Sequence, residues 1–352
     1  MLVKSKINGS YHVCFSEDFT SDLKKDIDVD ECFFLIDKNV YRLYKKQMGF
    51  IKKERIYFLN AIETNKTLDK VQEIIKHLLE NKFKKNHRIV AIGGGITQDL
   101  ACFISSTLFR GVKWSFYPTT LLAQCDSCIG SKSSINIGSF KNQVGTFYPP
   151  QQIVIDVKFL KTLEKEQLLS GLGEAIKVHY LDNKMRYQQV YDDYGPSQVD
   201  NRAMMRIIRG SLLIKRDIIE FDEFDRNYRN IMNYGHTFGH ALEASTNYEI
   251  PHGLAVTIGM GVANYISLND GMITQEIFNK MEALIQKNSR GVRFSFENIK
   301  EAYWESLKKD KKNIDDNIMC ILTEGFGKMN KHPRPLDENT KNLILSYMEK
   351  YQ

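Results

Sequence analysis

The pattern of apolar residues changes character about halfway along this 352-residue chain. Up to about residue 160, short apolar runs typical of buried strands alternate with segments whose apolar residues recur at helical spacing. Such an alternation predicts a parallel α/β sheet. The strand candidates are Cys32–Asp37, Arg55–Asn60, Arg88–Ile92, Val112–Pro118 and Gln152–Asp156, and the helix candidates are Thr64–Phe83 and Ile96–Phe109.

Beyond about Leu160, long helical patterns dominate. One short apolar run, Ile318–Leu322, is interpreted as an isolated strand. The chain is longer than a single core usually allows, so two domains are expected. We predict an α/β fold with an N-terminal parallel-sheet domain over residues 1–160. A mainly α-helical domain follows over residues 161–352.

Charge and composition exclude several classes of protein. Lys and Arg outnumber Asp and Glu by 49 to 43, and the excess is spread along the chain. A nucleic-acid binder would cluster its basic residues, whereas a small anionic substrate needs only local cationic pockets. The sequence has no apolar run of signal-peptide or membrane-spanning length, so a cytoplasmic protein without membrane contact is expected. Cys125 and Cys128 form a lone CxxC pair, interpreted as two buried, reduced thiols.

The first motif with chemical meaning is a glycine-rich turn between a strand and a helix. Gly93, Gly94 and Gly95 follow the strand candidate Arg88–Ile92 and precede the helix candidate. Glycines let backbone N–H groups approach phosphate oxygens closely, and a helix N-terminus attracts negative charge. The spacing is not that of the GxGxxG fingerprint, so a plain turn remains an alternative.

The second motif is a cluster of histidines. His236 and His240 in HTFGH lie one helical turn apart, and His252 follows in IPHGLAV. Histidines with a carboxylate can hold a divalent metal and leave one position open for substrate. Spacing alone does not identify the carboxylate, for which Glu174 and Glu243 are both candidates.

The third motif is the segment from Asp126 to Asn142, which is rich in glycine and small polar residues. It carries Lys132, Asn136 and Lys141, and such loops can wrap a phosphate or carboxylate. A solvated loop with exposed lysines is the alternative.

These motifs, in this order, resemble the sugar phosphate cyclases, and within them the 3-dehydroquinate synthase family. The matching stretches include GGGITQDLACF, YPTTLLAQCDS, GSFKNQVGTFYPP, GLGEAIK, RNIMNYGHTFGHALEA and HGLAVTIGM. The resemblance covers about residues 30–325. It implies an enzyme that uses NAD as a recycled catalyst and one divalent metal, zinc or cobalt. The domain over residues 1–160 would bind NAD, and the domain over residues 161–352 would bind the metal and the substrate. The substrate would be 3-deoxy-D-arabino-heptulosonate 7-phosphate, which loses phosphate and closes to 3-dehydroquinate in the shikimate pathway, the route to the aromatic amino acids.

The resemblance also implies roles for individual residues. The metal ligands would be Glu174, His236 and His252, whereas His240 would stand beside the substrate for proton transfer. The catalytic group would further include Asp126, Lys132, Lys177 and Lys215. Substrate contacts would come from Arg110, Lys141, Asn142, Arg229, Asn233 and one of Lys311 and Lys312, with Lys311 preferred. Cofactor contacts would come from Asp37, Glu63, Lys66, Gly94, Gly95, Asp99, Thr119, Thr120 and Thr162. Arg110 would reach the phosphate from a neighbouring subunit, which implies a homodimer.

Several positions depart from the family pattern. Leu254 stands where Glu is usual, which would loosen the support of His252, and Asp225 also replaces a Glu. Ser131 and Ser133 replace Gly and Thr, and Ile62 and Ile137 replace Gly and His. These changes leave room for a modified substrate. The alternatives are another sugar phosphate cyclase, a metal-dependent alcohol dehydrogenase, and a relative without catalytic activity.

Overall fold

The computed structural model describes residues 1–29, 31–138, 140–309, 313 and 317–351. The chain forms two compact units. The first comprises residues 1–163 together with 216–224, and the second comprises 164–215 together with 225–352. The sequence patterns gave no sign that a segment from the second half joins the first unit. The assignment of an NAD-binding and a metal-binding role to residues 1–160 and 161–352 stays a prediction.

The first unit is built on a seven-stranded sheet of order β1-β2-β9-β6-β5-β3-β4. All neighbouring pairs from β2 to β4 are parallel, and only β1 and β2 pair in the antiparallel sense. This confirms the predicted parallel α/β architecture. The strands are β1 (Leu2–Val3), β2 (Tyr11–Phe15), β3 (Cys32–Asp37), β4 (Ile56–Leu59), β5 (Arg88–Gly93), β6 (Lys113–Pro118) and β9 (Gln152–Ile155).

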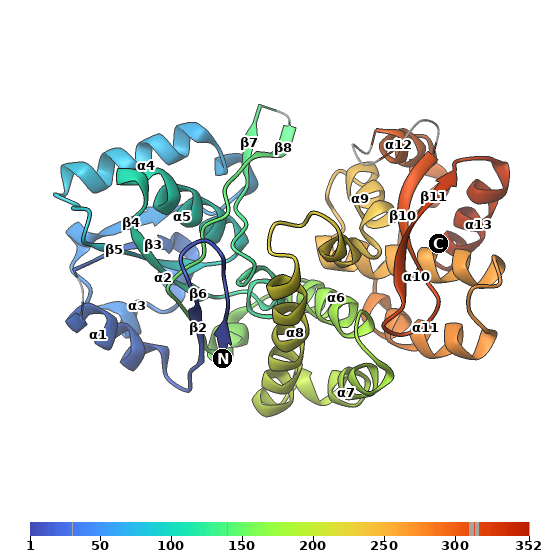
Figure 1. The fold of residues 1–352 in the computed structure, drawn as a ribbon, viewed down its shortest axis with the longest axis horizontal. Helices are drawn as coiled ribbons and strands as arrows, with labels where there is room; N and C mark the ends of the chain where they lie inside the picture. The colour runs from blue at the N-terminus through green and yellow to red at the C-terminus, as the bar shows by residue number, and fades with distance from the viewer. Residues whose placement is uncertain (30, 139, 310–312, 314–316, 352) are drawn as a thin grey trace. The chain divides into compact units, whose positions relative to one another are not determined.

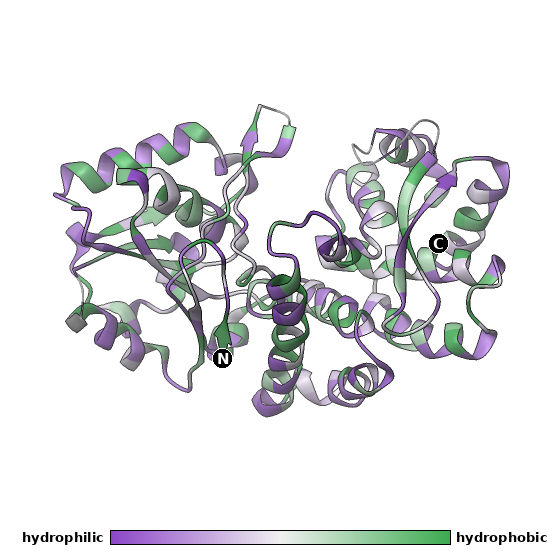
Figure 2. Ribbon diagram, in the orientation of Figure 1, coloured by the Kyte–Doolittle hydropathy of each residue, from purple (hydrophilic) through white to green (hydrophobic). Residues whose placement is uncertain are grey.

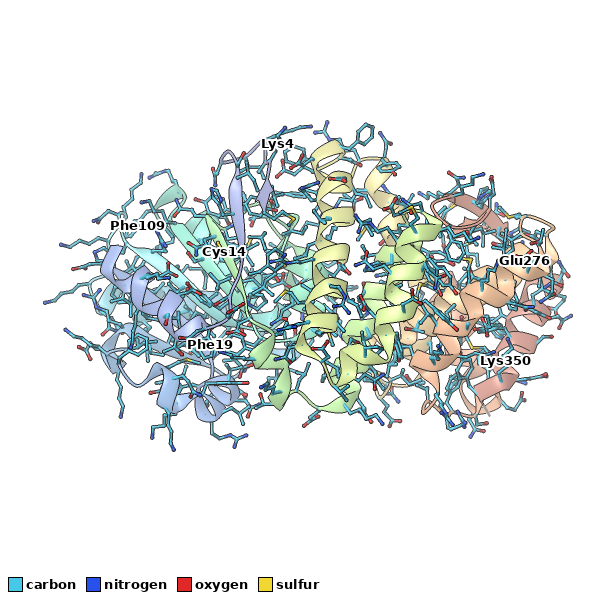
Figure 3. The ribbon with its side chains drawn as sticks, turned by 90° about the horizontal axis from the view of Figure 1, so that it is seen from below. Lys4, Cys14, Phe19, Phe109, Glu276 and Lys350 are labelled. Atoms are coloured by element: carbon cyan, nitrogen blue, oxygen red, sulfur yellow. The ribbon has the colours of Figure 1, made fainter. Side chains whose placement is uncertain are left out.

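Helices cover both faces of this sheet (Figure 1). They are α1 (Phe19–Val29), α2 (Lys38–Leu43), α3 (Lys45–Met48), α4 (Leu68–Glu80) and α5 (Gly95–Thr107). Helices α1 to α3 lie on one face, and α4 and α5 lie on the other (Figure 1). Alternate strand residues such as Phe34, Ile36 and Val90 join one core with Phe19, which Figure 3 labels. The ring of Phe19 lies 4.3 Å from that of Phe159.

Helix α4 shows why the predicted helix Thr64–Phe83 forms but is shorter. Thr67 is the N-cap, and its side chain accepts a hydrogen bond from the Lys70 amide. Val71, Ile74 and Leu78 are buried at helical spacing, and Figure 2 shows the matching alternation of apolar and polar residues along α4. The short 3₁₀ helices of this unit are Lys53–Arg55, Glu63–Asn65, Leu108–Arg110 and Val157–Thr162.

The segment 126–142 is more ordered than the loop that the sequence indicates. It begins in a π-helical turn, Ala123–Ser127, and continues into a hairpin of β7 (Ile135–Ile137) and β8 (Phe140–Val144). Figure 1 shows this hairpin projecting beyond the sheet.

The second unit is mainly helical, as predicted. Its helices are α6 (Lys165–Tyr180), α7 (Lys184–Tyr194), α8 (Asn201–Phe221), α9 (His236–Ser245), α10 (His252–Asn269), α11 (Gln275–Ser289), α12 (Phe296–Lys308) and α13 (Glu338–Met348), with 3₁₀ helices Pro196–Gln198, Tyr228–Asn233 and Glu349–Tyr351. Residues 216–221 of α8 belong to the first unit. No helix in the described part of the chain is long and apolar enough to cross a membrane.

The prediction of a strand at Ile318–Leu322 is confirmed, but the prediction that this strand is isolated is wrong. This run belongs to β10 (Asn317–Thr323), which pairs along its whole length with β11 (Met329–Pro335). Strand β11 is mostly polar and contains two prolines, so its sequence lacks the apolar run that identifies a buried strand.

Helix α10 forms the centre of the second unit. Every residue from Gly253 to Asn264 is buried, so the helix is enclosed on all sides. At the end of the chain, the buried carboxylate of Glu282 accepts hydrogen bonds from Tyr347 and from Lys350, which Figure 3 labels. These contacts bind α13 and the following 3₁₀ turn to α11.

Candidate functional site

Glycines bring three helices of the second unit into backbone contact. A Cβ atom on Gly173 of α6 would lie 2.1 Å from the carbonyl oxygen of Gly253 on α10, closer than any side chain allows. A Cβ atom on Gly239 of α9 would lie 2.9 Å from the Cα of Val256 on α10. Because only glycine permits such approach, α6 and α9 both lie against the first turns of α10. This packing brings Glu174, His236 and His252 together.

The three histidines form one cluster. His236 is the first residue of α9, His240 follows one turn later, and His252 is the first residue of α10. Their ring centroids lie 5.1 to 5.6 Å apart. One possible ligand atom from each of the three lies within 4.8 Å of the others.

Glu174 lies between this cluster and a lysine. One carboxylate oxygen, Oε2, accepts a hydrogen bond from the ammonium of Lys177, one turn further along α6. The other oxygen, Oε1, lies 3.4 Å from Nε2 of His252 and 3.9 Å from Nε2 of His236. Glu174 and Lys177 are both almost fully buried, so they form a buried ion pair.

The Nδ1 atoms of two histidines contact oxygen acceptors. Nδ1 of His236 lies 3.2 Å from the carbonyl oxygen of Tyr234, and Nδ1 of His252 lies 2.9 Å from Oε2 of Glu243. A carbonyl oxygen and a carboxylate can only accept, so each Nδ1 carries the proton. Burial lowers the pKa of His252, but its hydrogen bonds with Glu174 and Glu243 and their charges outweigh burial and raise this pKa to about 10.

This donor set fits a divalent metal. Two imidazole nitrogens and one carboxylate oxygen converge, and such a set binds catalytic zinc while leaving a coordination position open. The geometry brings Glu174, His236, His240 and His252 to one place. It does not decide whether Glu174 or His240 completes the ligand set, so the predicted division of roles stays a prediction.

The remaining predicted residues of the second unit lie in different surroundings. Arg229 is only 5% exposed within the 3₁₀ helix Tyr228–Asn233, so it is not a surface residue of the polar run around it. Lys215 is also buried. The side-chain amide of Asn233 donates to the carbonyl oxygen of Asn230. Lys311 lies outside the described residues.

In the first unit, the glycine-rich turn joins β5 to α5. Gly94 is the N-cap of α5, and a Cβ atom there would lie 3.0 Å from the side chain of Thr120. The amide of Thr119 donates to the carbonyl oxygen of Gly93. A Cβ atom on Gly95 would meet no other atom within 4 Å, so the first turn of α5 borders open space. An open helix N-terminus of this kind fits the phosphates of a dinucleotide.

A network of polar side chains connects several predicted residues of the first unit. The ammonium of Lys66 lies 3.1 Å from Oδ2 of Asp99, 2.7 Å from Oδ1 of Asn142 and 3.4 Å from Oε1 of Glu63. The amide and hydroxyl of Ser134 both donate to Asp99. Burial raises the pKa of Asp99, which Lys66 and Ser134 counteract. Asn142 contacts both Lys66 and Ser134. A residue that is predicted to bind substrate is thus connected to Lys66 and Asp99, which are predicted to bind cofactor.

The other predicted residues of this unit are described by contacts of their own. Asp37 caps α2, and burial raises its pKa. The hydroxyl of Thr162 lies 3.0 Å from that of Tyr44, and Asp126 is buried in the π-helical turn. The ammonium of Lys132 lies over the ring of Phe147. Arg110 and Lys141 are exposed.

The unusual residue Ser131 stands next to Lys132. Its φ angle of 64° lies in the left-handed region, which explains why glycine suits this position. The hydroxyl of Ser131 donates to the buried carboxylate of Glu223, which also accepts from Ser5 and from the amide of Lys6. The serine therefore ties the Lys132 loop to the N-terminal segment.

Cys125 and Cys128 are buried free thiols, as predicted. A separate cavity of about 1030 Å³ lies in the second unit, bordered by residues that include Leu169, Pro251 and Leu254. None of the described residues that border it is a predicted site residue. The assignment of function therefore rests on the polar clusters rather than on this cavity.

The fold is that of the sugar phosphate cyclases. A crystal structure of 2-deoxy-scyllo-inosose synthase complexed with carbaglucose-6-phosphate, NAD+ and Co2+ matches with a TM-score of 0.85 and 23% identity, covering 100% of this chain and 99% of that one. The 2-epi-5-epi-valiolone synthase from Streptomyces hygroscopicus subsp. jinggangensis 5008, with NAD+ and Zn2+ bound, matches with a TM-score of 0.82 and 21% identity over 99% of both chains. A probable glycerol dehydrogenase from Sinorhizobium meliloti 1021 matches less well, with a TM-score of 0.65 and 11% identity over 96% of both chains.

Sequence similarity narrows this class to one family. Residues 56–170 match the family model described as 3-dehydroquinate synthase N-terminal, and residues 171–313 match its C-terminal counterpart. The 3-dehydroquinate synthase of Clostridium tetani is 36% identical over 324 residues, covering 91% of this chain and 85% of the relative. That of Pelagibacter ubique is 33% identical, covering 98% of both chains. The chain belongs to the 3-dehydroquinate synthase family.

Proposed function

We propose that this chain is a 3-dehydroquinate synthase of the shikimate pathway. It would convert 3-deoxy-D-arabino-heptulosonate 7-phosphate to 3-dehydroquinate and phosphate. The observation that carries this proposal is the match of both family models across the two halves of the chain. The cluster of Glu174, His236, His240 and His252 supports it, because these residues would provide both the metal ligands and the group for proton transfer that the family requires.

When bound, NAD would supply reversible hydride transfer with a secondary alcohol of the substrate. In this chain the turn at Gly94 and Gly95 would receive its phosphates, because the first turn of α5 borders open space. The network of Lys66, Asp99 and Asn142, which lies in the same unit as this turn, would orient the bound cofactor. Relatives of the same fold have been crystallised with NAD+, which agrees with this assignment.

A divalent metal, when bound, polarises the hydroxyl group that is oxidised. Glu174, His236 and His252 would hold it, and cobalt or zinc would fit their nitrogen and oxygen donors. The resemblance assigns to His240 the movement of a proton at the neighbouring carbon, and its ring lies 5.1 Å from that of His236 and 5.6 Å from that of His252. Lys177 would orient Glu174 through their ion pair.

The resemblance favours a substrate that carries a carboxylate. It assigns Arg229 to substrate binding and Lys215 to the catalytic group, and both side chains are buried. A heptulosonate phosphate offers a carboxylate in addition to its phosphate, whereas sedoheptulose 7-phosphate offers only the phosphate. A guanidinium binds a carboxylate through two parallel hydrogen bonds, which favours the first substrate.

We further propose a cytoplasmic homodimer. Arg110 is exposed with a φ angle of 62°, and the resemblance assigns it to the phosphate of the neighbouring subunit. Light scattering would test the dimer. Mixing Arg110→Ala subunits with His240→Ala subunits should restore activity in mixed dimers if Arg110 acts across the interface.

The reaction itself is tested with purified protein, NAD and cobalt or zinc. Each of the two sugar phosphates is added separately, and released phosphate and product mass are measured. The proposal expects phosphate and 3-dehydroquinate from the heptulosonate phosphate. Preference for sedoheptulose 7-phosphate would assign the chain to another cyclase activity.

A further inference from the structure

Glu243 contacts His252 on the ring nitrogen that faces away from Glu174. Its Oε2 atom lies 2.9 Å from Nδ1, whereas Nε2 of the same ring lies 3.4 Å from Oε1 of Glu174. The two nitrogens of an imidazole point in divergent directions, so an ion held at Nε2 lies beyond the reach of Glu243. We propose that Glu243 is a positioning residue, which orients His252 toward the metal without binding the metal itself. The inference rests on the metal site of the proposed function.

The two candidate histidine ligands are oriented by different acceptors. His236 donates to the neutral carbonyl oxygen of Tyr234 at 3.2 Å, whereas His252 donates to a carboxylate at 2.9 Å. A charged acceptor makes a shorter, stronger hydrogen bond and increases the basicity of the opposite ring nitrogen. Loss of Glu243 should therefore weaken the bond that His252 forms with a metal.

The residue at position 254 makes the contact between Glu243 and His252 more important in this chain. The resemblance indicates a glutamate there, two residues after His252, but this chain has the buried, apolar Leu254. Leucine offers no hydrogen-bond acceptor, so the carboxylate that His252 contacts comes from a different helix. Glu243 lies on α9, seven residues after His236 and three after His240, which puts all three on one side of that helix. The loosening of His252 expected from Leu254 stays a prediction, and Glu243 provides a carboxylate contact from α9.

Metal affinity tests the proposal without any substrate. Purified wild type is stripped of metal and titrated with Co²⁺ against a competing chelator, and the visible absorption of bound cobalt is recorded. Glu243→Gln keeps an oxygen acceptor but loses the charge, so affinity should fall about 10-fold, and Glu243→Ala should lose up to about 100-fold. Both variants should still bind one cobalt at saturation, with a shifted visible spectrum. Glu243→Asp, which keeps the charge, should bind more tightly than Glu243→Ala.

Glu249→Gln is the matched control, because it makes the same change at an exposed glutamate in the turn after α9. It should leave affinity and spectrum unchanged. The proposal would be overturned if Glu243→Gln and Glu243→Ala both kept the cobalt affinity and the spectrum of the wild type. It would also be overturned if these variants bound no cobalt at saturation, because Glu243 would then be a metal ligand. If Glu243 only stabilised the fold, the metal-free variants would unfold at a lower temperature and their folded fraction would keep the cobalt spectrum of the wild type. That result would also contradict the proposal. If wild type itself binds no cobalt, the metal site of the proposed function fails together with this inference. If wild type binds cobalt and the variants match it, only this inference fails.

Discussion

The polar clusters of the two units differ in how their charges are arranged. In the first unit, Lys66 is surrounded by Asp99, Asn142 and Glu63, so one cation meets several oxygen acceptors. In the second unit, one buried carboxylate, Glu174, faces Lys177 on one side and two histidine nitrogens on the other. The first arrangement satisfies its own charges and should support the fold. The second brings histidine ring nitrogens and a carboxylate to one point, which suits an added cation.

The largest expected effect separates two histidines within the second cluster. His236→Ala should abolish both metal retention and activity, because it removes a nitrogen that faces Glu174. His240→Ala should keep the metal and lose activity, since its predicted role is proton transfer. Metal content by elemental analysis and the rate of phosphate release provide the measurements. His12→Ala, at an exposed position on β2, is the control, and equal metal loss in both cluster variants would contradict the division of roles.

Arg229 tests whether the second unit recognises a carboxylate. Removing a charged partner from a desolvated site costs about 2 to 5 kcal/mol, so Arg229→Ala should lower kcat/KM roughly 30- to several-thousand-fold. Arg229→Lys should recover part of this loss, because the charge returns without the two-pronged geometry. The same variants are assayed on sedoheptulose 7-phosphate. An unchanged preference between the two substrates would remove Arg229 from substrate recognition.

Lys66 tests the stabilising role of the first cluster. Its side chain is 7% exposed, and removing one partner of a buried ion pair costs about 3 to 5 kcal/mol. Lys66→Met should lower the free energy of unfolding by about that amount in denaturant titrations, and the double variant Lys66→Met/Asp99→Asn should recover part of it. Lys70→Met, four residues later in the first turn of α4 and in a surface ion pair, should cost less than about 1 kcal/mol. Equal stability of Lys66→Met and Lys70→Met would show that the first cluster does not support the fold.

His179 gives the smallest and most specific effect, on the pH dependence of stability. It lies on α6 with Glu174, but its Nδ1 contacts the carbonyl oxygen of Ala175, and burial lowers its pKa to about 4. The unfolded imidazole takes up a proton below about 6.5, whereas the folded one does so only below about 4. This contribution to stability is therefore complete above about pH 6.5 and declines as the pH falls toward 4, by about 3 kcal/mol at ~1.36 kcal/mol per pH unit. The slope should be smaller in His179→Asn, and an equal slope would show that burial does not depress this pKa.

Local sequence patterns predicted the features of the fold and the site that depend on residues close together in the sequence. The five predicted strands of the first half match β3, β4, β5, β6 and β9, and HTFGH with IPHGLAV pointed to the histidine cluster, because a helical turn fixes that spacing. Glu174 lies about sixty residues earlier, so only the family resemblance identified it. The link from Lys66 to Asn142 spans 76 residues and depends on the fold of the β7–β8 hairpin. Strand β11 was missed because polar residues and prolines hide its alternation.

The proposed activity requires that NAD act as a recycled catalyst in a phosphate-eliminating cyclisation. Purified protein with cobalt, the heptulosonate phosphate and NAD far below the substrate concentration should release phosphate over many turnovers. Product mass should match 3-dehydroquinate, and absorbance at the NADH wavelength should not accumulate. Phosphate release that stops after one equivalent of NAD, with NADH rising in step with product, would contradict the account and assign the chain a dehydrogenase activity.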